Sequence, residues 1–136
     1  MVLYCTERFK QQVAVLEKNN SYSAIIVDIC DYFKDKNIDE LHITKDIIRS
    51  STNKYRIGNS LSNKGKSSSY RCISGCYVKK DFLVLDTIYP KTGSDGIDNL
   101  SVEKYKEIAG NIKNAIESYS LYELDIELKA FSKVKK

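Results

Sequence analysis

A run of basic residues without acidic neighbours occupies the middle of the sequence. Residues 47–80 contain no Asp or Glu but eight Lys and Arg residues, so this stretch carries +8 while the whole chain carries +4. Protein surfaces normally intersperse both signs of charge. The asymmetry predicts an anionic partner, and phosphate backbones are the commonest one. The basic residues are Arg49, Lys54, Arg56, Lys64, Lys66, Arg71, Lys79 and Lys80.

Three of these cations have a spacing suited to chemistry on a phosphodiester. Lys54 and Arg56 are two residues apart, so they project from one face of a strand, and Arg71 opens the next apolar run. RNA cleavage by the ribose 2′-OH passes through a phosphorane whose additional negative charge is stabilised by fixed cations. The reaction also needs a proton acceptor and a proton donor. The only histidine, His42, lies outside the stretch, so we expect a lysine with a lowered pKa and a tyrosine in these roles.

Each candidate also has a purely structural interpretation. Arg71 could pair with Asp86 across the sheet. Lys54 and Arg56 could form an ordinary solvated strand face. Tyr89 could belong to the core rather than to a site. The sequence leaves these alternatives open.

Two further cations and two aromatic residues complete the candidate interface. Lys64 and Lys66 lie in a polar, Gly-containing segment, residues 62–69, which predicts a turn. Because a flexible turn positions side chains poorly, we expect these lysines to attract RNA rather than to react. Tyr55 and Tyr70 lie inside the basic stretch, and their rings are candidates for stacking on unpaired bases.

Apolar periodicity predicts the elements that position these residues. Stripes at helical spacing predict two N-terminal helices and a later third helix, and three apolar runs joined by short turns predict an antiparallel meander. The order of elements predicts a single α+β domain over residues 1–136, with its helices packed on a small antiparallel β-sheet. Residues 120–136 are expected to form an edge strand or a flexible tail. The predicted helices span residues 6–19, 22–33 and 101–119, and the predicted strands span residues 2–5, 54–61, 70–78 and 82–89.

Composition also indicates the compartment. No apolar run approaches the roughly 20 residues that span a bilayer, and residues 1–10 lack the apolar centre of a secretory signal. We therefore expect a cytoplasmic protein with no membrane partner. Cys5, Cys30, Cys72 and Cys76 form no C-x-x-C pair, which favours reduced thiols used as small apolar residues over a zinc site. We expect neither a metal nor a small-molecule cofactor.

The basic strand, the turn and the aromatic-Arg pair together resemble the RelE/ParE toxins of bacterial toxin–antitoxin systems. RelE-like toxins carry a basic-x-basic strand, a turn rich in Gly, Ser and Lys, and an aromatic-Arg pair that opens the next strand. The end of the following strand is similar to the Tyr-x-Lys strand end of the wider group. This chain departs from many relatives in having Ser67-Ser68-Ser69 without a glycine, which removes the freedom of positive φ from that turn. The matching residues are Lys54-Tyr55-Arg56, residues 64–69, Tyr70-Arg71 and Ile88-Tyr89-Pro90-Lys91-Thr92-Gly93.

The resemblance implies a toxin that cleaves mRNA during translation, with two N-terminal helices packed against the sheet. It implies that Arg71 contacts the scissile phosphate and that Lys54 and Arg56 supply the proton acceptor and stabilise charge. Lys91 matches a second cation at a strand end, and Tyr89 is the candidate for proton handling or base stacking.

The resemblance also implies partners, namely a cognate antitoxin protein and mRNA on the ribosome. Two other functions stay open: a non-catalytic ParE-like inhibitor of DNA gyrase, and a plain RNA-binding module outside toxin–antitoxin systems. Lys54, Arg56 and Arg71 favour the nuclease over the gyrase inhibitor, because ParE members tend to lack the full cationic set. Exposed aromatic residues on the sheet would favour the RNA-binding module.

Overall fold

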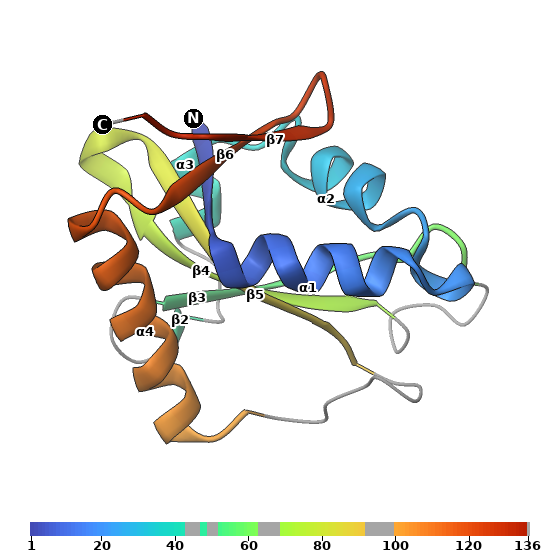
Figure 1. Ribbon diagram of the computed structural model, residues 1–136, viewed down its shortest axis with the longest axis horizontal. Helices are drawn as coiled ribbons and strands as arrows, with labels where there is room; N and C mark the ends of the chain where they lie inside the picture. The colour runs from blue at the N-terminus through green and yellow to red at the C-terminus, as the bar shows by residue number, and fades with distance from the viewer. Residues whose placement is uncertain (43–46, 49–51, 63–68, 92–99, 136) are drawn as a thin grey trace.

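The structure, a computed structural model, describes residues 1–42, 47–48, 52–62, 69–91 and 100–135. Its strands form one sheet in the order β2-β3-β4-β5-β1-β6-β7, with helices packed on the two faces (Figure 1). The α+β class predicted from the sequence is confirmed. The strands are β1 (Val2–Thr6), β2 (Ile47–Ile48), β3 (Thr52–Ile57), β4 (Tyr70–Tyr77), β5 (Phe82–Pro90), β6 (Leu121–Asp125) and β7 (Ala130–Lys133), and the helices are α1 (Glu7–Glu17), η1 (Asn20–Tyr22), α2 (Ile25–Phe33), α3 (Ile38–His42), η3 (Val78–Lys80) and α4 (Val102–Glu117).

One pair of strands differs from the predicted antiparallel sheet. β1 and β5 run parallel, with Val2 opposite Phe82 and Cys5 opposite Leu85. Parallel pairing requires a long crossover connection, and α1, α2 and the first strands of the meander supply it here. The other neighbouring pairs between described strands are antiparallel, so the sheet is mixed rather than purely antiparallel.

The first helix begins where the sequence predicts. Thr6 has extended backbone angles, and its Oγ1 accepts a hydrogen bond from the backbone N–H of Phe9 at 3.3 Å, which caps α1. The apolar stripe of Phe9, Val13 and Leu16 is buried, as its helical spacing predicts. α1 therefore leaves β1 directly and lies along β5 (Figure 1).

The second predicted helix is divided. Asn19 Oδ1 accepts from the N–H of Ser21 at 2.9 Å and starts the short η1, and α2 follows from Ile25. A further helix, α3, was not predicted. It begins at a reciprocal cap in which the Glu40 N–H donates to Asn37 Oδ1 at 3.0 Å and the Asn37 N–H donates to Glu40 Oε1 at 3.4 Å.

The predicted meander is confirmed as β3, β4 and β5, which pair in sequence order. Its register shifts once, because Ile73 faces Thr87 while Ser74 faces Leu85. Asp86 is thus an additional residue on β5, at a β-bulge in a mostly apolar strand.

The two faces of the sheet carry different cores. Tyr55, Tyr70 and Leu83 belong to a cluster with residues of α1, α2 and α3, and Ile73 and Val84 belong to a second cluster with residues of α4. Successive strand residues point to opposite faces, so we call these the α1 face and the α4 face. At the far end of the sheet from β2, β6 and β7 form a hairpin beside β1, and β7 is the edge strand (Figure 1).

Candidate functional site

Three predicted site residues share one face of the sheet. Arg56 on β3 lies directly opposite Arg71 on β4, and Lys54 lies opposite Ile73. Residues directly opposite on neighbouring strands present their side chains on the same face. Since Ile73 packs beneath α4, all three cations lie on the α4 face. We call Lys54, Arg56 and Arg71 the basic row.

The three side chains of the basic row differ in exposure. Arg56 is exposed, Lys54 is half-buried, and Arg71 is only 6% exposed. Arg71 Nη1 donates to Ser69 Oγ at 2.9 Å and to the carbonyl oxygen of Tyr70 at 3.4 Å. These contacts fix one nitrogen of the guanidinium at the start of β4, so the group is held in place by residues next to it in sequence.

The sequence left open that Arg71 pairs with Asp86, but the carboxylate of Asp86 has other partners. Asp86 is fully buried, and its ion pair in the described structure is with Arg8 on α1. It also accepts from Thr6 Oγ1 at 2.9 Å, Thr87 Oγ1 at 2.8 Å and Asn111 Nδ2 at 2.6 Å. These four donors provide the hydrogen bonds that a buried carboxylate requires.

This buried polar cluster was missed by the sequence interpretation. Arg8 also forms an ion pair with Glu107 on α4, so it links α1, β5 and α4. A signal for it exists in the sequence, because a lone acid within the apolar run of residues 82–89 has to find a donor elsewhere. No local pattern indicates that the donor is Arg8.

Tyr89 on β5 lies next to the basic row. It lies opposite Arg71, which places its side chain on the same face. Its side chain is 4% exposed, and burial, reinforced by Tyr105 and opposed by Arg71, raises its pKa to about 12. The phenol is therefore protonated at neutral pH, so it is able to donate a hydrogen bond and is not a proton acceptor.

The expected RNA-binding role of Tyr70 is wrong. Its side chain is 0% exposed, and its ring packs against Tyr22 at 5.9 Å between centroids, on the α1 face. Tyr55 is buried on the same face, where its hydroxyl accepts from Ser74 Oγ at 2.9 Å. The physical reason is the period of two along a strand, which places Tyr70 and Arg71 on opposite faces.

The other predicted site residues lie at the ends of strands or beyond. Lys91 directly follows β5; its side chain is half-buried, and its backbone N–H donates to the carbonyl of Ser69 at 3.1 Å. This bond places Lys91 beside the start of β4, where Arg71 is held. Lys64 and Lys66 lie outside the described residues.

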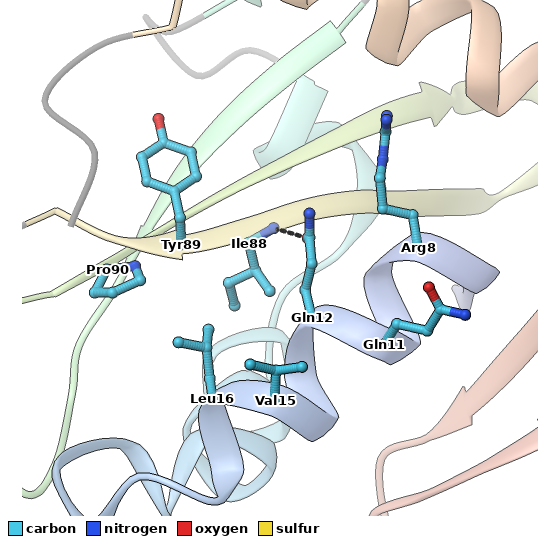
Figure 2. A pocket seen from close by; sticks show the side chains of 8 residues that line it. All are labelled: Arg8, Gln11, Gln12, Val15, Leu16, Ile88, Tyr89 and Pro90. Atoms are coloured by element: carbon cyan, nitrogen blue, oxygen red, sulfur yellow. Dashed lines mark hydrogen bonds between the residues drawn. The ribbon is translucent and has the colours of Figure 1, made fainter. Parts of the chain in front are cut away.

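A groove of about 350 Å³ opens between α1 and β5, next to Tyr89 (Figure 2). β1 ends at Thr6, whereas β5 continues beyond the last paired position, Leu85. Along this continuation the Ile88 N–H donates to Gln12 Oε1 at 2.9 Å, so a side chain takes the place of a neighbouring strand. The residues lining the groove are Arg8, Gln11, Gln12, Val15, Leu16, Ile88, Tyr89 and Pro90.

Comparison of the sequence with known proteins gives no relative: no family model matches the chain, and no curated protein matches it either. Among the described residues, no group of three or more His, Cys, Asp or Glu side chains could hold a metal ion. The helices of the described part are all too short or too polar to cross a membrane.

Proposed function

We propose that this protein binds RNA on the α4 face and acts as a toxin that cleaves mRNA during translation. The observation that carries the proposal is the register of β3, β4 and β5, which gathers Lys54, Arg56, Arg71 and Tyr89 on one face. The described residues of β3 and β4 contain no acid that could neutralise the row from the same strands. Such a surface attracts a phosphate backbone.

The row also has the groups that a phosphoryl transition state needs. Arg71 is anchored by Ser69, and an anchored guanidinium can hold phosphate oxygens in a fixed geometry. Arg56 adds an exposed positive charge directly opposite. Lys54 is the candidate proton acceptor for the 2′-OH, and no metal is required for this type of cleavage.

The proposed partner that silences the toxin is an antitoxin with an acidic segment. A surface with several cations and no acid on β3 and β4 is complementary to such a segment. The segment and RNA would compete for the basic row, which is how binding of the antitoxin would block cleavage.

A second candidate function, RNA binding without cleavage, is favoured by the burial of Arg71. With 6% of its surface exposed, Arg71 presents little of its guanidinium to a ligand. In that case Arg56 and Lys54 would carry the binding and Arg71 would mainly organise the start of β4.

Cleavage of a reporter mRNA in a bacterial translating extract separates the two functions. The variants are Arg56→Ala and Arg71→Gln, with Lys79→Ala as the control because Lys79 is an exposed cation of the same basic stretch outside the row. We expect each row variant to slow cleavage about 10²–10³-fold, the usual cost of one donor to a developing anion, and the control to keep most activity. Binding of RNA by the wild type without any cleavage would replace the nuclease by the binding module.

A further inference from the structure

The groove beside α1 adjoins the basic row. Tyr89 lines the groove and is the cross-strand partner of Arg71, so one residue belongs to both. Neighbouring strands lie about 4.8 Å apart. An RNA strand whose phosphate lies on Arg71 therefore brings an adjacent base within reach of the groove.

Two residues that line this groove each have a buried donor that lacks a hydrogen bond. Arg8 Nε and the Tyr89 hydroxyl are buried, and neither has a hydrogen-bond partner in the described part of the chain. Figure 2 shows both side chains rising on the same side of β5, with the amide nitrogen of Gln12 between them. Arg8 is held in this position because its two terminal nitrogens are occupied by Glu107 and Asp86. Buried donors without acceptors are costly unless a ligand supplies the acceptors.

Half of the lining residues of the groove are apolar. Val15, Leu16, Ile88 and Pro90 contribute most of its hydrophobic lining, and Val15 is 67% exposed at its rim. The volume of about 350 Å³ lies within the range of small-molecule sites. Apolar walls with a few donors suit a flat ring that carries acceptors on its edge.

We propose that this groove binds one unpaired base of the RNA, and that it selects uracil or guanine over cytosine and adenine. This inference rests on the proposed function, because the basic row holds the backbone of the same strand. Uracil offers the O4 acceptor and guanine the O6 acceptor at the positions where cytosine and adenine carry amino donors. Because the buried groups without partners among the lining residues are donors, they can bind O4 of uracil or O6 of guanine, whereas they would face the amino groups of cytosine and adenine.

Short labelled oligonucleotides test the inference by fluorescence anisotropy. Oligo-uridine and oligo-cytidine of equal length differ at position 4 of the base, and we expect the wild type to bind oligo-uridine about tenfold more tightly. Tyr89→Phe removes only the hydroxyl and should reduce this ratio to below about twofold. Val15→Glu narrows the rim of the groove and adds a negative charge that repels the RNA phosphates. It should therefore lower the affinity for oligo-uridine and also reduce the ratio below about twofold.

Two matched controls exclude general effects. Tyr77→Phe removes a hydroxyl on β4 away from the groove, and Val27→Glu places the same charge on exposed α2; both should keep the wild-type ratio. Equal, salt-sensitive binding of both oligonucleotides by the wild type would overturn the base site and leave the proposed function intact. Failure of the wild type to bind either would overturn both, and an unchanged ratio in Tyr89→Phe and Val15→Glu would remove the groove as the reading site.

Discussion

At the scale of single residues, Asp86 shows how a strand of the core accommodates a charge. The β-bulge adds one residue to β5, and the carboxylate then meets Arg8, Thr6 and Asn111 from three different elements. A sequence pattern can indicate that an acid in an apolar run needs partners. It cannot identify them, because they are separated from Asp86 by up to 80 residues.

The burial of two thiols makes the free energy of unfolding depend on pH. Burial raises the pKa of Cys5 to about 12 and that of Cys30 to about 11, against 9.0 for an ordinary thiol. Both thiols are neutral in the fold, whereas the unfolded chain loses these protons above pH 9, so their contribution is complete below pH 9 and is lost as the pH rises toward 11–12. We expect the free energy of unfolding to fall by about 1 kcal/mol per thiol between pH 8 and pH 10.

Urea unfolding at these two pH values measures the effect. The Cys5→Ala/Cys30→Ala variant is less stable at pH 8 because it loses packed volume, but its stability should decline less between the two values. An equal decline in both proteins would show that the two thiols do not cause it.

At the scale of elements, α1 connects the sheet to the site. Thr6 performs two tasks at the start of this helix, because its Oγ1 accepts from the Phe9 N–H and its hydroxyl donates to Asp86. Ser101 caps α4 in the same manner, accepting from the Lys104 N–H at 3.1 Å, but it is exposed. The two caps therefore allow a direct comparison.

We expect Thr6→Ala to destabilise the protein by about 2–3 kcal/mol, because it removes a cap and one donor to a buried carboxylate. Ser101→Ala should cost about 1 kcal/mol, since it removes a cap alone. Chemical denaturation of the two variants tests the difference. Thr6→Ser, which keeps the hydroxyl, should recover most of the stability, and equal losses in Thr6→Ala and Ser101→Ala would contradict the second role of Thr6.

Local patterns predicted the elements better than their long-range pairing. The stripe of α1, the third predicted helix and the meander are confirmed, because the periodicity that predicts them is a local property. The helix α3 was missed although Asn37 and Glu40 have the spacing of a capping box. The parallel pairing of β1 with β5 could not be predicted from local patterns, because the interacting residues lie 80 positions apart.

The candidate site also combines features that local patterns predict with features that depend on long-range pairing. The alternation of side chains along a strand places Lys54 and Arg56 on the same face, as the sequence predicted. The same alternation places Tyr70 and Arg71 on opposite faces, which the sequence interpretation overlooked. The groove between α1 and β5 could not be found from sequence, because it exists only where β1 stops before β5 does.

At the scale of the whole molecule, cations on the α4 face should contribute to the salt dependence of RNA affinity, and cations on the α1 face should not. RNA bound on the α4 face releases about 0.7 counterions from a single strand for each phosphate contact. We therefore expect Arg56→Ala to reduce the slope of log affinity against log salt concentration by about 0.7. The slope is measured by anisotropy over a series of potassium chloride concentrations.

Lys34→Ala provides the matched control, because Lys34 is an exposed cation at the end of α2, which packs on the α1 face. Its slope should equal that of the wild type. A similar reduction in both variants would mean that RNA is attracted by the overall charge of the protein rather than bound on one face.

The position of β1 inside the sheet has a consequence for synthesis. Residues of β1 leave the ribosome before those of β5 and β6, which are their neighbours in the sheet. Until Phe82–Pro90 has emerged, Leu3 and Cys5 have no strand on which to pair, and the apolar stripe of α1 has no sheet to cover. Contacts between residues so distant in sequence close slowly. The nascent chain therefore completes this part of its sheet only after β5 and β6 have been made, and until then it presents an exposed apolar helix to the chaperones that meet it.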